Sequence, residues 1–222
     1  MKKLLFLLVL TVISSSVVRA DNYNDGIKAY EKKDYAAAFK LWCPLAMKGD
    51  VSAQSILGLM YQDGQGVKRD YKEAIKWYQK AAKQGDVSAQ LNLAIMYDNG
   101  KDGINQDYKE AVKYYGLAAK QGNAGAQFNL AYMYAKGKGA VQDYKESVKW
   151  YRKAAEQGHA KAQYSLGFMY GNGQGVIKDH LNAYMWLDLS AVSYTHLRAH
   201  ETLMNLVCRL LLEKSRSIFG HC

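Results

Sequence analysis

The stretch DYKEAIKWYQKAAKQGDVSAQLNLAIMYDNG, residues 70–100, decides the fold of this chain. It opens with Asp70, a residue that suits a helix N-cap, and continues with apolar residues such as Ala74 at helical spacing. Gly85 and Asp86 then interrupt the pattern, because glycine tolerates the left-handed backbone that ends a helix and aspartate can cap the next one. A second apolar run follows and ends in a glycine-rich loop. The stretch therefore predicts two helices joined by a short turn.

Copies of this helix pair fill most of the chain. Units begin at Asp34, Asp70, Asp107 and Asp143, and a fifth, cut off inside its first helix, begins at Asp179; successive starts lie 36 or 37 residues apart. A unit this small cannot bury its apolar faces alone, so the copies must stack. We therefore expect an all-α fold, an α/α superhelical solenoid of helix-turn-helix repeats over residues 34–191, preceded by a partial N-terminal helix within residues 21–33.

Local signals support the same helices. In three units a glutamate stands three residues after the starting aspartate, a pattern that predicts a capping box at Glu73, Glu110 and Glu146. Pro44 lies inside the first helix of the first unit, where it removes one backbone hydrogen bond and predicts a kink. Aligned leucines and small residues in the second helices are expected to pack between neighbouring helices: Leu57, Gly58, Leu93, Ala94, Leu130, Ala131, Leu166 and Gly167.

The run DYKEAIKWYQKAAKQGDVSAQLNLAIMY, followed by a glycine-rich loop, resembles the Sel1-like repeat family, whose members are related to tetratricopeptide repeats. The resemblance covers nearly all of residues 34–191, and many positions agree in every unit. It implies an α/α superhelix that serves as an adaptor or binding surface for a protein or peptide partner. It does not imply an enzyme.

By comparison with tetratricopeptide repeats, two positions four residues apart on each second helix face the inner, concave wall. These pairs are Ser55 and Leu59, Leu91 and Ile95, Phe128 and Tyr132, and Tyr164 and Phe168. Our hypothesis is that they form a groove for an extended peptide or an amphipathic helix. The alternative is that these side chains pack against the adjoining repeats.

The two ends of the chain differ from its repeats. Residues 1–20 carry two lysines, an apolar run of about ten residues and small residues before Ala20, which predicts a signal peptide cleaved after Ala20 and a periplasmic or secreted protein. An uncleaved membrane anchor is the alternative. No later segment is apolar enough to span a membrane, so we expect no stable span after cleavage.

Residues 192–222 resemble translated sequencing-adapter sequence. VSYTHLRAHET begins at Val192, and LVCRLLLEK over residues 206–214 matches a second adapter piece after a gap of the length that a sample index needs. We therefore interpret this segment as a non-native tail and expect that the native protein continues beyond residue 191.

These ends carry seven of the 30 basic and two of the 20 acidic residues, so residues 21–191 hold 23 basic and 18 acidic residues. Their lysines are spread along the helices without a basic cluster, which argues against nucleic acid as a partner. Cys43 is the one cysteine between Asp21 and Ala191, so no disulfide is expected within that segment.

Several motifs could suggest chemistry, but each fits structure better. The Gly-x-Gly pairs follow helices rather than strands, which favours turns over phosphate loops. The segment Asp98–Gly103 lacks the ligands of a calcium loop, and His159 and His180 have no partner at metal-ligand spacing. Cys43 has no triad pattern and is expected to be a packed thiol. We therefore predict no catalytic residues, no metal and no cofactor.

The favoured function is thus a protein-protein interaction scaffold. The alternative is a secreted hydrolase or β-lactamase-like enzyme acting on cell-wall material. Residues 21–191 contain no Ser-x-x-Lys motif, so that alternative has little support in the sequence.

Overall fold

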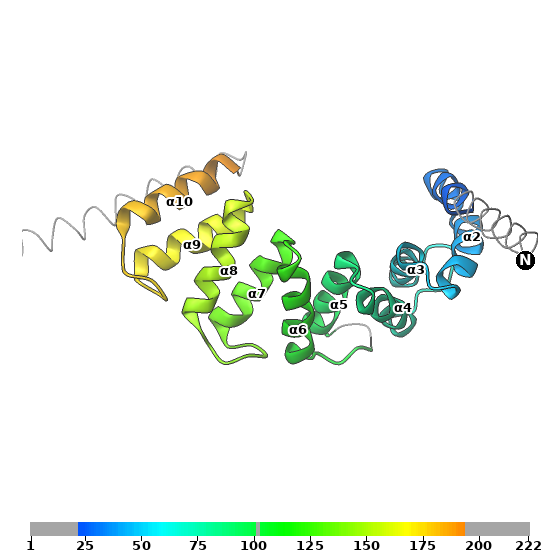
Figure 1. Cartoon of the computed structure of the whole chain (residues 1–222), viewed down its shortest axis with the longest axis horizontal. Coiled ribbons are helices and arrows are strands. Elements are labelled where there is room, and N and C mark those ends of the chain that lie inside the picture. The colour runs from blue at the N-terminus through cyan, green and yellow to red at the C-terminus, as the bar shows by residue number, and fades with distance from the viewer. Residues whose placement is uncertain (1–21, 101–102, 194–222) are drawn as a thin grey trace, which may run out of the picture. The chain divides into compact units, whose positions relative to one another are not determined.

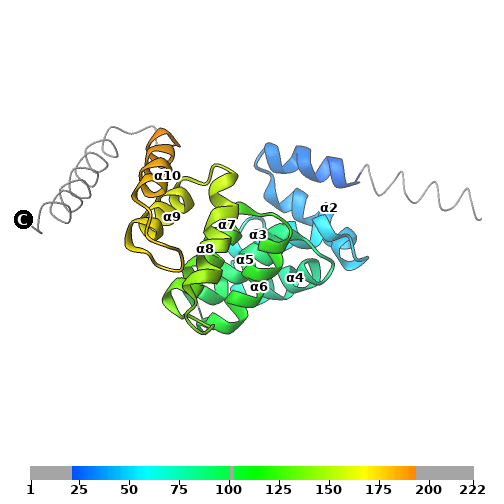
Figure 2. The same ribbon diagram turned by 60° about the vertical axis from the view of Figure 1, so that its left-hand side comes forward.

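The computed structural model describes residues 22–100 and 103–193, and within these ranges the chain contains helices and loops but no strand (Figures 1 and 2). A helical segment covers residues 22–31. The helices that follow are α2 (Tyr35–Met47), α3 (Val51–Asp63), α4 (Tyr71–Lys83), α5 (Val87–Asn99), α6 (Tyr108–Lys120), α7 (Ala124–Lys136), α8 (Tyr144–Glu156), α9 (Ala160–Asn172) and α10 (His180–Ser193). The chain divides into two compact units, Met1–Gln106 and Asp107–Cys222. Within each unit consecutive helices pack in pairs, which confirms the predicted all-α, helix-pair solenoid fold.

Aspartate caps start the first helices, as predicted. Oδ1 of Asp70 accepts hydrogen bonds from the backbone N–H groups of Lys72 (2.9 Å) and Glu73 (3.1 Å), and Asp107 and Asp143 cap α6 and α8 in the same way. The cap predicted for the second helix at Asp86 is also confirmed, and the aligned residues Asp50, Asn123 and His159 cap the other second helices. The positions of the helix ends are therefore encoded by short side chains next to each turn.

The predicted capping box, however, is only half formed. The Glu73 carboxylate pairs with Lys76 instead of turning back, and the backbone N–H of Asp70 donates to the carbonyl of Tyr61 (2.9 Å). The prediction that glutamate completes the box was wrong because the preceding helix already supplies an acceptor. Glu146 likewise pairs with a lysine, Lys149, at 3.0 Å.

The core of each unit is built from leucine and alanine, and small residues allow close helix contact. A Cβ added to Gly58 would lie 2.5 Å from the ring of Tyr78, and one added to Gly167 would lie 2.8 Å from Leu187. The predicted packing leucines are fully or almost fully buried: Leu57, Leu93, Leu130 and Leu166. These positions are confirmed as packing positions.

Buried glutamines add a set of hydrogen bonds that the sequence analysis did not identify. In each second helix a glutamine amide donates to an alanine carbonyl of the first helix, as Gln54 does to Ala46 (3.0 Å). Gln84, just beyond α4, donates to the side-chain oxygen of Gln54 (2.8 Å), and Gln157 donates to that of Gln127 (2.7 Å). The glutamines therefore link successive repeats, and not only the two helices of one pair.

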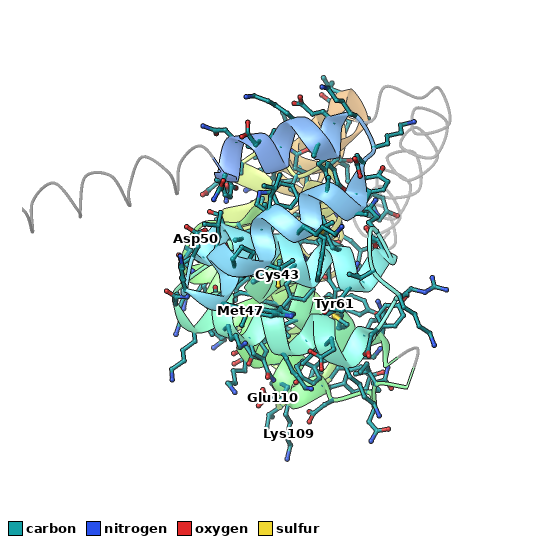
Figure 3. All side chains as sticks on the ribbon, turned by 90° about the vertical axis from the view of Figure 1, so that its right-hand side faces the viewer. Cys43, Met47, Asp50, Tyr61, Lys109 and Glu110 are labelled. Atoms are coloured by element: carbon teal, nitrogen blue, oxygen red, sulfur yellow. The ribbon has the colours of Figure 1, made fainter. Side chains whose placement is uncertain are left out.

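The helical segment 22–31 packs on α2 through Trp42. The indole N–H of Trp42 donates to the carbonyl of Tyr23 (3.2 Å), and a Cβ added to Gly26 would overlap the indole ring. Cys43, the next residue on α2, is half-buried and packs against the same core cluster (Figure 3). Helix α2 continues through Pro44 to Met47, and the kink at Pro44 stays a prediction.

Helix α10 differs from the other first helices on its outer face. Leu181, Met185 and Leu189 are 79%, 43% and 42% exposed, and they align with exposed lysines of α8: Lys145, Lys149 and Lys153. The helix extends to Ser193, two residues into the segment interpreted as a tail. Residues 1–21 and 194–222, on which the signal-peptide interpretation and most of the tail fall, lie outside the described residues. Among the helices that are described, none is long and apolar enough to cross a membrane.

Candidate partner-binding site

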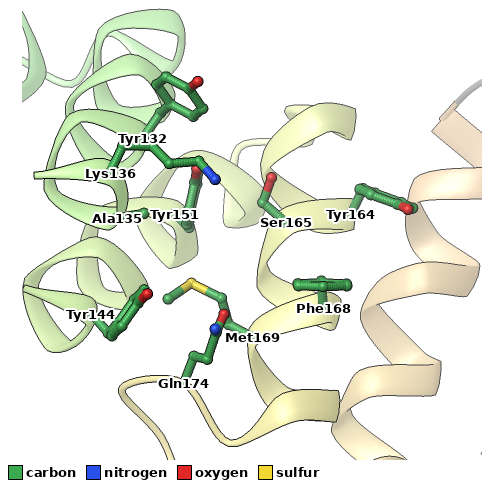
Figure 4. Close-up of a pocket in the computed structure, with 10 residues that line it drawn as sticks. All are labelled: Tyr132, Ala135, Lys136, Tyr144, Tyr151, Tyr164, Ser165, Phe168, Met169 and Gln174. Atoms are coloured by element: carbon green, nitrogen blue, oxygen red, sulfur yellow. The ribbon is translucent and has the colours of Figure 1, made fainter. Parts of the chain in front are cut away.

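A cavity of about 330 Å³ opens between helices α7, α8 and α9 of the second unit (Figure 4). Its volume is at the lower end of the range for ligand pockets, enough for one large side chain. Aromatic rings and one thioether form most of its walls. The lining residues are Tyr132, Ala135, Lys136, Tyr144, Tyr151, Tyr164, Ser165, Phe168, Met169 and Gln174.

Three of the residues proposed from sequence meet at this cavity. Tyr132 projects from α7, and Tyr164 and Phe168 lie one turn apart on α9. These residues are 39%, 46% and 49% exposed. We call Tyr132, Tyr164 and Phe168 the aromatic stripe.

Phe128 does not join the stripe. Its ring stacks on that of His159, with centroids 4.9 Å apart, and lies 5.7 Å from the ring of Tyr151. His159 caps the following second helix, so Phe128 packs against the adjoining repeat, as the alternative interpretation predicted. Ser55, at the same position in the first unit, donates to the next cap, Asp86, at 3.0 Å.

The remaining candidates lie in the first unit. Leu59 and Leu91 are half-buried, and Ile95 is 37% exposed. The cavity of the second unit does not include them.

The sequence analysis missed several residues of the cavity. Tyrosine also stands at the positions aligned with Tyr144 and Tyr151 in other units, so the sequence does not set these two residues apart. Lys136 carried a signal that could have been used: as the last residue of α7 it aligns with the last residues of the other second helices, which are Asp63, Asn99 and Asn172. A departure from the repeat at one position is evidence of a local role.

Tyr151 forms part of the cavity wall while remaining largely buried. Burial raises the pKa of its phenol to about 12; a hydrogen bond with Ser165 lowers the pKa and Tyr132 raises it slightly. The phenol is therefore neutral at physiological pH and keeps a proton to donate. Ser165 also donates its hydroxyl to the carbonyl of Lys161 (2.9 Å).

His159 makes the start of α9 sensitive to pH. Its Nδ1 accepts from the N–H of Ala162 (3.2 Å), which requires a neutral ring, and burial, followed by Lys161, lowers the pKa of His159 from 6.5. A lowered folded-state pKa means that the unfolded chain binds the proton more tightly, so this contribution to stability is complete above pH 6.5 and is lost as the pH falls through the lower folded value.

We therefore expect the urea midpoint of the second unit to fall more steeply on acidification in the wild-type chain than in His159→Asn. Asparagine keeps the cap, as Asn123 does on α7, but does not titrate. The measurement is urea unfolding followed by circular dichroism at a series of pH values. Parallel pH profiles for the two proteins would show that His159 does not act as a neutral cap.

No group of three or more His, Cys, Asp or Glu side chains within residues 22–100 and 103–193 is arranged to hold a metal ion. Both glycines of each Gly-x-Gly pair adopt positive φ, as Gly137 (65°) and Gly139 (71°) do, which confirms that the pairs are turns. Residues 101 and 102 of the calcium-like segment lie outside the described ranges.

The family model of the Sel1 repeat matches residues 20–50, 51–86, 87–123, 124–159 and 160–191. This chain is a Sel1 repeat protein. From residue 51 on, the family model starts each unit at a second helix, half a repeat away from the aspartates used above, and with the same spacing of 36 or 37 residues. Sel1 repeats generally form protein-interaction scaffolds, bind proteins and are typically not enzymes.

Two solved structures resemble this Sel1 repeat protein closely. One is c5321, a protective antigen of uropathogenic Escherichia coli strains with an SLR fold; it is 36% identical, with a TM-score of 0.74 over 78% of this chain and 38% of c5321. The other is a Sel1 repeat protein from Oxalobacter formigenes, 37% identical, with a TM-score of 0.72 over 76% of this chain and 69% of that protein. This chain thus spans much less than half of c5321. No curated protein matches it.

Proposed function

We propose that this protein is an exported interaction module that captures a peptide or protein partner through the aromatic stripe of its second unit. The observation that carries the proposal is the meeting of Tyr132, Tyr164 and Phe168 at one cavity, with each ring 39–49% exposed. Exposing rings to water is unfavourable, and burying them against a partner would recover free energy on binding. Leu59, Leu91, Ile95 and Phe128 are secondary candidates, of which Phe128 has the weakest claim because it already packs on His159.

Membership of the Sel1 repeat family supports a scaffold role, and the exposed rings at the cavity support this surface as the place where the partner binds. Side chains of aromatic hot spots at the centre of an interface commonly contribute about 2 kcal/mol or more to binding.

Export is proposed from residues 1–20 alone. N-terminal sequencing of the mature protein from the periplasm or medium tests it, and a chain that still begins at Met1 would contradict cleavage.

The binding proposal is tested with the full chain immobilised in extracts of its native compartment. Phe168→Ser is expected to reduce recovery of a saturable partner by about tenfold or more. Leu117→Ser is the matched control, because Leu117 on α6 is 40% exposed but does not line the cavity. If Tyr132→Ser, Tyr164→Ser and Phe168→Ser all leave recovery intact, the stripe is not the binding surface. Turnover of a cell-wall or β-lactam substrate without any saturable partner would favour the hydrolase alternative.

A further inference from the structure

One side of the cavity carries positive charge. Lys136 is the last residue of α7 and lines the cavity. Lys138 does not line it, and its Nζ atom lies 4.8 Å from the ring centroid of Tyr108 and 5.8 Å from that of Tyr132. A cation at a helix C-terminus is favoured by the helix dipole, so Lys136 is stable where it stands. The aligned last residues of the other second helices are not basic: they are Asp63, Asn99 and Asn172. The lysine at this position is therefore specific to the helix that borders the cavity and is not a feature of the repeat.

The other lining residues do not balance that charge. Among the ten residues described around the cavity, none is Asp or Glu, and the polar groups are hydroxyls and the amide of Gln174. The apolar walls come chiefly from Tyr132, Tyr144, Phe168 and Met169, with Met169 reaching from α9 toward Tyr144 (Figure 4). Such a site favours a ligand with an apolar body and an adjacent anion.

We infer, resting on the proposed function, that the partner is an acidic peptide segment. One aromatic or long aliphatic side chain of that segment fills the cavity, and an Asp or Glu within one or two residues of it pairs with Lys136. The volume of about 330 Å³ admits one such side chain rather than a stretch of peptide, so the anchor is a single residue and the acidic neighbour supplies orientation.

The test uses three fluorescently labelled peptides of one length in a Gly-Ser background, containing Phe-Glu-Glu, Phe-Lys-Lys or Ala-Glu-Glu. Anisotropy with the full chain is expected to show the Phe-Glu-Glu peptide binding about tenfold more tightly than either of the others. Raising the salt concentration should weaken only the binding of the acidic peptides, because the pairing with Lys136 is near the surface.

Charge reversal gives the sharper readout. Lys136→Glu should weaken the Phe-Glu-Glu peptide about tenfold and strengthen the Phe-Lys-Lys peptide, whereas Lys120→Glu should change neither. Lys120 is the matched control because it is also the exposed last residue of a helix, α6, and changes the net charge equally. Circular dichroism melting of both variants shows that each is folded, and Lys136→Gln serves as a second variant that removes the charge without reversing it.

Three results would overturn the inference. Equal binding of the Phe-Glu-Glu and Phe-Lys-Lys peptides, abolished by Phe168→Ser, would leave the proposed groove in place and remove the acidic preference. If none of the three peptides binds while Phe168→Ser still loses the natural partner, the proposed groove again stands and the acidic preference is again removed. Saturable binding of oligogalacturonate without binding of the Phe-Glu-Glu peptide would show that the anion is a sugar acid. Intact partner capture by Phe168→Ser would instead contradict the proposed function itself.

Discussion

Gly139→Ala is expected to lower the free energy of unfolding of the second unit by about 3 kcal/mol or more. Gly139 has φ +71°, where an alanine is strained, and a Cβ there would overlap the carbonyl oxygen of Tyr108 at the start of α6. That carbonyl belongs to a first turn fixed by the Asp107 cap, so neither backbone can move without breaking hydrogen bonds. Urea unfolding followed by circular dichroism measures the loss.

Gly122→Ala separates the two causes. Gly122 also has positive φ (+91°), but a Cβ there would meet nothing within 4 Å, so only the backbone cost of about 1 kcal/mol is expected. If the two variants lose the same stability, contact with Tyr108 is not what requires glycine. The same close approach recurs at Gly66 with Tyr35 and at Gly175 with Tyr144, which explains why the second glycine of each Gly-x-Gly pair is retained along this chain.

The helices could be predicted from the sequence because their signals are local. Asp70 and Gly85 mark the ends of α4 within a few residues, and the same kind of signal recurs in other units at a spacing of 36 or 37 residues. The capping box at Asp70 was predicted wrongly because it depends on a contact from outside the helix. Whether Glu73 turns back depends on Tyr61, a residue of the preceding helix whose position no local pattern reveals.

The candidate site could be predicted only in part for the same reason. Spacing on the second helices identified Phe128 and Tyr132 as equivalent, yet stacking of the next repeat places His159 against Phe128 and leaves Tyr132 open. Which of two positions stays exposed depends on the offset between repeats, which is a property of the packed fold. Lys136, in contrast, could have been identified by comparing the repeats with one another.

Leu166→Ala and Phe168→Ala, two residues apart on α9, should separate the core from the site. Leu166 of α9 is fully buried, and a Cβ added to its neighbour Gly167 would lie 2.8 Å from Leu187 of α10. Removing the leucine side chain leaves a cavity in a close-packed contact and should cost about 2–5 kcal/mol of stability. Phe168 is 49% exposed, so its removal should cost about 1 kcal/mol or less.

Two measurements distinguish the roles of Leu166 and Phe168 in α9: urea unfolding reports stability, and peptide anisotropy reports binding. Leu166→Ala should lower the urea midpoint while the folded fraction still binds, whereas Phe168→Ala should keep the midpoint and lose binding. If the two variants lose the same stability, Phe168 belongs to the core. Its ring would then stabilise the fold and would not be free to contribute to partner binding. A clear separation would show that one helix uses alternate residues for cohesion and for recognition.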